Sequence, residues 1–161
     1  MVWGVAGAEA DQKLRQAAQK GDLALLKAAI AERADVNGRG TNGLPPLLEL
    51  VRTAGGPLNE ERRQCVAYLL ERGAGIDATD SDGRTALIQA TRLGDLETVR
   101  LLVEAEAYVK ARDRFHKSAL FYAVEGRRRD IVLYLAANGD LVSMTVKERK
   151  ANKQEKPRPG S

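Results

Sequence analysis

The stretch from Thr79 to Asp113 reads TDSDGRTALIQATRLGDLETVRLLVEAEAYVKARD and decides the fold, because the chain repeats it about 33 residues further on. Within it, a D-x-D-G-x-T turn precedes a short apolar helix, a Gly-Asp break and a second apolar helix. Without any gap, the shift pairs Asp80 with Asp113, Thr85 with Ser118, Leu87 with Leu120, Ala90 with Ala123, Val99 with Val132 and Leu102 with Leu135. A fixed period of this length predicts an array of helix pairs, not a single globular core.

Further segments follow the same pattern, so residues 11–140 divide into four units. We place the units at about residues 11–40, 41–78, 79–113 and 114–140. The first unit lacks the turn at its front, and its early polar residues suit the outer face of a terminal repeat. In the second unit, Pro45-Pro46 is typical of the first turn of a helix.

The second unit is longer than the others by about seven residues, inserted between its two helices. We expect Gly55-Gly56-Pro57 to end the first of these helices. Asn59 should cap the second helix, with Glu60 and Glu61 in its first turn. Gly73 should then close that helix.

The fourth unit keeps the spacing but loses two glycines. His116 stands where the third unit has Gly83, and Arg127 stands where it has Gly94. We expect His116 to take the left-handed backbone conformation of Gly83, which glycine adopts most easily. Gly126, one place earlier than Arg127, should take over the part of Gly94.

This arrangement resembles the ankyrin repeat, whose pattern runs from a turn through T-P-L-H-x-A-A and a glycine to a second helix ending in L-L-x-x-G-A-D-V-N. The resemblance covers residues 11–140, and residues 34–37 reproduce the ADVN ending without change. It implies an all-α solenoid of helix-turn-helix units with short turn or hairpin tips, and an inserted loop at the end away from those tips. Leu48, Ile88 and Phe121 replace the family's histidine, so we expect more apolar stacking and a less regular stack.

The two ends of the chain differ from the repeats. We expect residues 1–10 to form a flexible leader. Residues 141–154 should cap the last unit, with a helix over 146–154, and residues 155–161 should be a disordered basic tail. Residues 141–161 hold six Lys and Arg against two Glu, so they account for the whole formal net charge of +4.

No set of residues in the sequence suggests catalysis, a metal or a cofactor. The one histidine, His116, lies in a turn, and the one cysteine, Cys65, falls at a buried helix position where it acts as a small hydrophobe. There is no C-x-x-C or H-x-x-x-H spacing for a metal and no phosphate loop with its lysine. We therefore predict a protein that is not an enzyme and uses no cofactor.

In ankyrin-repeat proteins the turn tips and the exposed faces of the first helices form a concave surface that binds partner proteins. Carried over by position, the resemblance places on this surface Arg39, Asn42, Leu44, Ser81, Asp82, Arg84, Arg92, Arg112, Arg114, Phe115 and Lys117. Arginine can hold a carboxylate with two hydrogen bonds. We therefore expect a non-catalytic interaction module that binds an acidic segment of a partner protein. The simpler interpretation is that these arginines only solubilise the edge of the turns.

Two other functions stay open. An exported inhibitor or immunity-type protein that masks a partner enzyme would explain Ala8-Glu9-Ala10, which has the small-x-small form of a signal-peptidase site. A protein that binds nucleic acid or an anionic surface would use Arg127–Arg129 and the basic tail. However, no aromatic residue lies between the basic residues of the tail to stack on bases.

Cysteine content and hydropathy bear on the compartment. A single cysteine excludes an intramolecular disulfide framework, which fits a reducing compartment. The sequence contains no run of about 18 apolar residues, so it predicts no membrane-spanning helix. We expect a cytoplasmic monomer, with export as the alternative.

Overall fold

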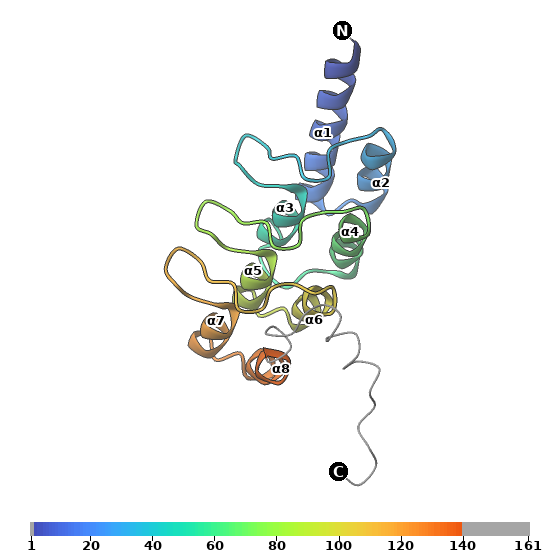
Figure 1. Cartoon of the computed structure of the whole chain (residues 1–161). Helices are drawn as coiled ribbons and strands as arrows, with labels where there is room; N and C mark the ends of the chain where they lie inside the picture. The colour runs from blue at the N-terminus through green and yellow to red at the C-terminus, as the bar shows by residue number, and fades with distance from the viewer. Residues whose placement is uncertain (1, 140–161) are drawn as a thin grey trace.

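The computed structural model describes residues 2–139, which form eight helices in two rows (Figure 1). The helices are α1 (Val2–Lys20), α2 (Leu23–Ala31), α3 (Pro46–Arg52), α4 (Glu60–Glu71), α5 (Ala86–Arg92), α6 (Leu96–Glu104), α7 (Ala119–Glu125) and α8 (Arg129–Gly139). Within these residues there is no strand, and the one β pairing is an isolated antiparallel bridge between Arg112 and Ser118. The predicted all-α fold is therefore confirmed, and the bridge gives the last turn a hairpin-like tip.

The odd-numbered helices stack in one row and the even-numbered helices in the other (Figure 1). Each odd-numbered helix pairs with the next even-numbered one, and α1, α3, α5 and α7 pack against one another in sequence. Long loops join α2 to α3, α4 to α5 and α6 to α7, and their tips project beyond the odd-numbered row, on the left of Figure 1. This is the arrangement of a solenoid, in which each unit contacts only its neighbours.

α1 extends almost to the N-terminal end of the chain, whereas the C-terminal end lies outside the described residues. α1 begins at Val2, so the structure places residues 2–10 on a helix where the sequence predicted a flexible leader. Ala10 is only 1% exposed, so this helix already packs against the stack there. The predicted capping segment (141–154) and tail (155–161) lie outside the described residues. None of the described helices is both long and apolar enough to cross a bilayer.

Most helices begin at a short polar residue whose side-chain oxygen accepts a backbone N–H three residues later. These N-caps are Asp22, Asn59, Thr85, Asp95 and Ser118. α3 instead starts at Pro46 after Pro45, because proline holds φ near the helical value and no donor is needed in the first turn. The predictions for Asn59 and for the two prolines are confirmed.

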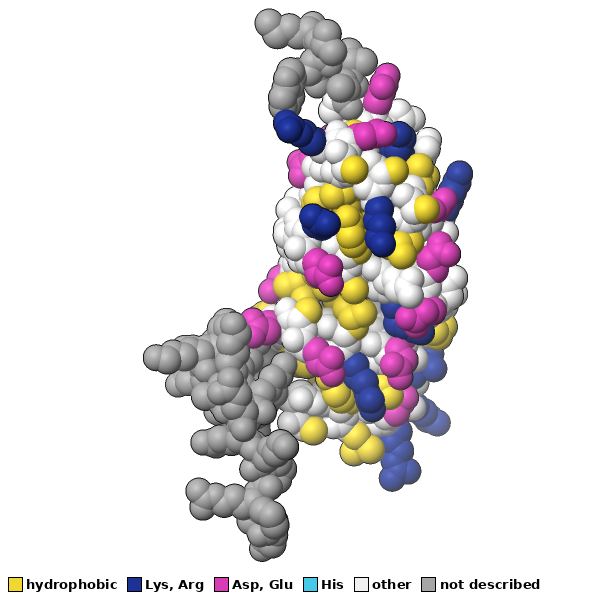
Figure 2. All heavy atoms as spheres, turned by 90° about the vertical axis from the view of Figure 1, so that its right-hand side faces the viewer, with side chains coloured by type: hydrophobic (Ala, Val, Ile, Leu, Met, Phe, Trp, Pro, Cys, Tyr) yellow, Lys and Arg dark blue, Asp and Glu magenta, His cyan; other side chains and the backbone are white. Residues whose placement is uncertain are grey.

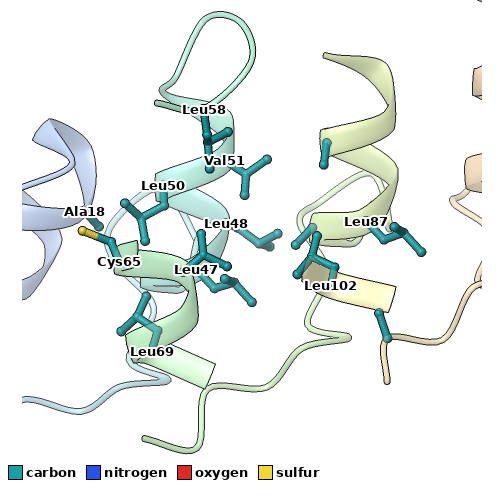
Figure 3. Packing of buried hydrophobic residues seen from close by; sticks show 14 of the residues in the cluster. Ala18, Leu47, Leu48, Leu50, Val51, Leu58, Cys65, Leu69, Leu87 and Leu102 are labelled. Carbon is teal, nitrogen blue, oxygen red and sulfur yellow. The ribbon is translucent and has the colours of Figure 1, made fainter. Parts of the chain in front are cut away.

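Leucine side chains fill the space between the two rows (Figure 3). The residues that are at most 1% exposed include Leu47, Leu50, Leu69, Leu87 and Leu102. Cys65 on α4 is also fully buried in this core. Burial, helped by the nearby charge of Glu61, raises the pKa of the Cys65 thiol to about 11, so it stays protonated at neutral pH. A buried, protonated thiol acts as a small hydrophobe, as the sequence predicted.

The insertion in the second unit joins the C-terminal end of α3 to α4, on the side away from the tips, and it places Arg62 against the ends of two helices. The Arg62 guanidinium donates to the carbonyls of Gln19 (2.6 Å) and Leu50 (2.9 Å), with a longer contact to Ala18 (3.4 Å). These carbonyls belong to the last turns of α1 and α3, where no N–H of the same helix is available. The insertion therefore supplies one cap that α1 and α3 share.

Two residues of the fourth unit take the left-handed conformation that the third unit gives to glycine. His116 has a φ of 61° and Gly83 has 74°, which confirms the expectation for His116. Arg127 has a φ of 55°, whereas Gly126 keeps a φ of −82°. The prediction that Gly126 replaces Gly94 is therefore wrong. The left-handed residue between the two helices stays 33 positions after Gly94, so Arg127 itself adopts a backbone conformation that is sterically unfavourable for a residue with a side chain.

Glycine at position 116 or 127 should raise the free energy of unfolding by a few tenths to about 1 kcal/mol, because it removes the clash of a side chain at positive φ. Urea denaturation of His116→Gly and Arg127→Gly measures this directly. Gly83→Ala is the matched control and should destabilise, since its Cβ would lie 3.2 Å from the Arg114 nitrogen at a φ of 74°. Loss of stability in both glycine variants would contradict this account of the fourth unit.

Candidate functional site

An aspartate opens each of the last two tips and binds the backbone of its own turn. Asp113 Oδ1 accepts the N–H groups of Phe115 (2.9 Å) and Lys117 (3.0 Å). Asp80 makes the same pair of bonds one unit earlier, at 2.8 and 3.0 Å. The other carboxylate oxygen of Asp113 accepts the hydroxyl of Tyr122 on α7. Each tip is thereby tied to the helix that follows it.

Asp113 is the most buried charge of this region, since its side chain has no exposed surface. Burial alone would raise the pKa of its carboxyl. The hydrogen bonds from Tyr122, Lys117 and Phe115 and the charge of Arg84 outweigh burial, so the pKa lies below its ordinary value of 3.8. The carboxylate is therefore ionised at neutral pH and holds the fourth tip in place.

Arg84 links the third tip to the fourth. Its guanidinium lies 3.2 Å from Asp82 and 3.6 Å from Asp113, and its side chain is only 16% exposed. Asp82 also holds Arg114, through an ion pair at 3.2 Å and through its carbonyl, which accepts the Arg114 N–H at 2.9 Å. Arg84 is thus a structural link whose charge is balanced by two carboxylates.

Seven side chains of the third and fourth units gather on this scaffold, and we call them the aromatic–basic cluster: Arg84, Arg92, Arg114, Phe115, Lys117, Phe121 and Tyr122. Three cations surround the Tyr122 ring, with Arg92 at 5.4 Å, Lys117 at 5.7 Å and Arg84 at 5.9 Å from its centroid. Arg114 lies 4.8 Å from the Phe115 ring, and Lys117 lies 5.0 Å from the Phe121 ring. Phe121 meets Tyr122 edge-on, at 6.2 Å between centroids.

Two rings of the aromatic–basic cluster face solvent. Phe115 is 49% exposed and Phe121 is 48% exposed. Half-exposed aromatic rings within one cluster are typical of surfaces that a partner covers. Cations held over these rings are positioned before any partner arrives. The cluster therefore offers apolar anchors and positive charge on one rigid surface.

The structure brings five of the predicted site residues into the aromatic–basic cluster: Arg84, Arg92, Arg114, Phe115 and Lys117. Asp82 is joined to them by its ion pairs. Arg112 is exposed next to the cluster, two residues before Arg114, and Ser81 is exposed in the neighbouring tip.

The predicted residues of the second unit lie outside the aromatic–basic cluster. Leu44 is 3% exposed and packs in the core, so we correct the expectation that it faces a partner. Asn42 binds its own turn at the Leu44 N–H (3.1 Å) and donates to the Glu49 carboxylate. Arg39 donates to the Thr79 carbonyl at 2.9 Å and so ties the second tip to the third.

The sequence-based site residues omit Phe121 and Tyr122. Phe121 aligns with Leu48 and Ile88, which are 2% and 1% exposed, so its position predicts burial. Tyr122 aligns with Glu49 and with a glutamine on α5, both of which bind their tips. This recurrent polar position was the signal that could have identified Tyr122.

Residues 2–139 contain no group of three or more His, Cys, Asp or Glu that could hold a metal. On the side of the even-numbered helices, shallow hollows of about 480 Å³ and 370 Å³ lie between α4 and α6 and between α2 and α4. Figure 2 shows both signs of charge mixed with apolar groups on that side. This side is therefore less distinctive than the aromatic–basic cluster.

Comparison with known proteins settles the family. A family model for ankyrin repeats (3 copies) matches residues 14–113 and again residues 58–145. The chain belongs to the ankyrin-repeat family. Ankyrin repeats generally mediate protein–protein interaction and are generally non-catalytic, so the ankyrin fold agrees with a surface built for binding.

Several ankyrin-repeat proteins are similar to this chain over part of their length. Ankyrin repeat domain-containing protein 63 of Mus musculus is 33% identical over 110 residues, which are 67% of this chain and 27% of that protein. Notch-regulated ankyrin repeat-containing protein of Xenopus tropicalis is 42% identical over 60 residues, 37% of this chain and 53% of that protein. B-cell lymphoma 3 protein homolog of Mus musculus is 37% identical over 105 residues, 65% of this chain and 22% of that protein. The chain thus spans about a quarter to a half of these relatives.

Proposed function

We propose that this ankyrin-repeat chain binds an acidic segment of a partner protein through the aromatic–basic cluster and the adjacent Arg112. The supporting observation is the set of three cations around the Tyr122 ring, flanked by two half-exposed phenylalanines. Arg92 and Arg112 form no ion pair within residues 2–139, so their charges are available to carboxylates of a partner. The phenylalanine rings suit the apolar side chains between those carboxylates.

The surface is rigid before binding, which favours affinity. Asp113 and Asp82 fix the backbone and side chains of the tips, so little conformational entropy is lost when a partner binds. Lys117 pairs with Glu125 at 3.4 Å, but the two side chains are 35% and 54% exposed, and an ion pair open to solvent contributes at most about 1 kcal/mol. A carboxylate of the partner can therefore replace Glu125 at small cost.

Selection from a library of randomised peptides tests the proposal without knowledge of the partner. The wild-type chain should enrich peptides that combine Asp or Glu with aliphatic residues. The triple variant Arg112→Ala, Arg114→Ala, Phe115→Ser should bind the selected peptides at least about tenfold more weakly, because each truncated anchor costs about 1 kcal/mol or more. Its melting temperature should stay nearly unchanged, since all three side chains are exposed.

The matched control removes two exposed arginines and one half-exposed aromatic elsewhere: Arg72→Ala, Arg100→Ala, Tyr108→Ser. Tyr108 is 49% exposed, like Phe115. This control should keep full affinity for the selected peptides. If the triple variant also keeps full affinity, or if only the control loses it, the aromatic–basic cluster does not bind the partner.

A further inference from the structure

The last odd-numbered helix, α7, exposes the face that the corresponding helix of the third unit, α5, buries. On α5, Leu87 is 1% exposed and Thr91 is 0% exposed, because α7 packs over them. The same positions on α7 are Leu120 and Val124, and these are 38% and 59% exposed. Leucine and valine are apolar, whereas the exposed positions of a surface helix are usually polar. We call the surface around this pair, which Ser118, Leu120, Phe121, Val124 and Glu125 form, the end face.

The end face is hollowed, and its shape fits a helix. Ser118, Leu120, Phe121, Val124 and Glu125 line an open hollow of about 500 Å³. Glu125 is the one acidic group among them, and it pairs with Lys117. In the stack, each odd-numbered helix covers the one before it (Figure 1). An occupant that repeats this packing is a helix with an apolar stripe lying along α7.

Charge distinguishes between the segments that could dock on the end face: a partner's helix, a second copy of the chain or the chain's own C-terminal residues. Residues 114–139 hold five Lys and Arg against two acidic residues, whereas residues 2–113 hold fifteen against seventeen. Basic side chains also gather at the lower end of the stack in Figure 2. A second copy docked through the same face would bring two positive ends together, which is unfavourable. The chain's own predicted capping segment, residues 141–154, lies outside the described residues. Residues 147–161 are basic like the fourth unit and contain no aliphatic or aromatic residue except Ala151, so only residues 141–146 could compete for the end face, and a variant described below tests them.

We propose that the end face docks an acidic amphipathic helix of a partner protein, which extends the row of α1, α3, α5 and α7. Its apolar stripe covers Leu120 and Val124, and its acidic flanks face the net positive charge of the fourth unit. This surface shares Phe121 with the aromatic–basic cluster but does not include Arg112, Arg114 or Phe115, so variants of these three residues separate the end face from the proposed function.

Fluorescence anisotropy with a designed helical peptide tests this proposal. The probe carries leucine at positions i, i+3, i+4 and i+7, glutamate beside the leucines and alanine elsewhere. It should bind the full chain at least about tenfold more tightly than the same peptide with lysine in place of glutamate. The double variant Leu120→Ser, Val124→Ser should weaken binding at least about tenfold. Val124→Glu, at the more exposed position, should also weaken binding, because its carboxylate repels the glutamates of the probe, and it should leave the core unaffected.

Two further variants of the full chain exclude the other binding modes. The triple variant Arg112→Ala, Arg114→Ala, Phe115→Ser should bind the probe as the wild type does, which shows that the peptide is not held by the neighbouring tip. Replacing Leu141, Val142, Met144 and Val146 together by Ser should also leave affinity unchanged. A tenfold or greater gain in that variant would overturn the proposal, because the chain's own segment would then cover the end face.

Sedimentation velocity completes the test. The chain should sediment as a monomer, and a dimer that Leu120→Ser, Val124→Ser dissociates would overturn the proposal in favour of a second copy. Equal binding of the glutamate and lysine probes, or equal binding by the wild type and the double variant, would likewise overturn it. Loss of binding by both end-face variants, with the other two variants unaffected, is the result that supports it.

Discussion

Arg62→Ala should lower the free energy of unfolding by about 3 kcal/mol, although Arg62 lies beside a surface insertion. Its guanidinium donates to Gln19 and Leu50 carbonyls at 2.6 and 2.9 Å and to Thr53 Oγ1 at 3.1 Å. A hydrogen bond to a charged group contributes about 1.5 to 3 kcal/mol, and its loss leaves the part-buried Leu50 carbonyl unpaired. The positive charge also lies at the negative ends of α1 and α3, which adds to the stabilisation.

Two companion variants separate this capping from a general loss of charge. Arg62→Lys keeps the charge, but lysine has no planar group that reaches both helix ends. Its free energy of unfolding should therefore lie between those of the wild type and Arg62→Ala. Arg52→Ala removes an exposed arginine from the last turn of α3 and should cost no more than about 0.5 kcal/mol. Urea denaturation of the three variants gives the comparison. Similar costs for Arg62→Ala and Arg52→Ala would show that the shared cap does not stabilise the stack.

Asp113→Ala should destabilise the chain by about 3 kcal/mol and loosen the fourth tip. The carboxylate is fully buried and accepts two backbone N–H groups and the Tyr122 hydroxyl, with Arg84 beside it. Its removal leaves these donors without their acceptor and leaves Arg84 with Asp82 alone, the situation in which breaking a buried pair is expensive. Asp80→Ala removes the equivalent residue of the third unit, which is only half-buried, and should cost about 1 to 2 kcal/mol.

The same aspartate predicts a pH dependence. Because its pKa is lowered in the folded chain, Asp113 stabilises the fold above the ordinary pKa of 3.8, and this contribution is lost as pH falls through the lower folded value. The difference in unfolding free energy between the wild type and Asp113→Asn should therefore be constant above about pH 5 and shrink below about pH 4. A difference that grows as the pH falls would contradict the lowered pKa.

The period of the sequence predicts the fold well, because each unit repeats the same local choices. Polar N-caps at Asn59 and Thr85, prolines before α3 and leucines at fixed spacing all act within one helix pair. Local rules of this kind can be recognised in one sequence. The sequence analysis did not single out Arg62, although it lies two periods before Arg128 and both side chains lie against a glycine of the preceding unit, Gly21 and Gly94. Its bonds to Leu50 and Thr53 could not be predicted, because they depend on the path of the inserted segment.

The candidate site was predicted only in part. The basic tip residues are found by position, but the exposure of each depends on contacts between units. Leu44 follows the Gly43 turn, and that turn directs its side chain into the core. Tyr122 becomes the centre of the aromatic–basic cluster only because Asp113, Arg84 and Arg92 converge on it from two units. Such convergence is a property of the stack and cannot be read from one repeat.

If the aromatic–basic cluster and Arg112 bind an acidic segment of a partner protein, the amide signals of these residues should respond to such a segment. The most direct test is to map backbone amide chemical shifts by NMR while the wild-type chain is titrated with an acidic peptide selected from the library. Shift changes should concentrate at residues 112–122 and at Arg92. In the Arg112→Ala, Arg114→Ala, Phe115→Ser variant the same positions should show no such changes. Shift changes confined to the even-numbered helices α2, α4 and α6 would contradict this prediction.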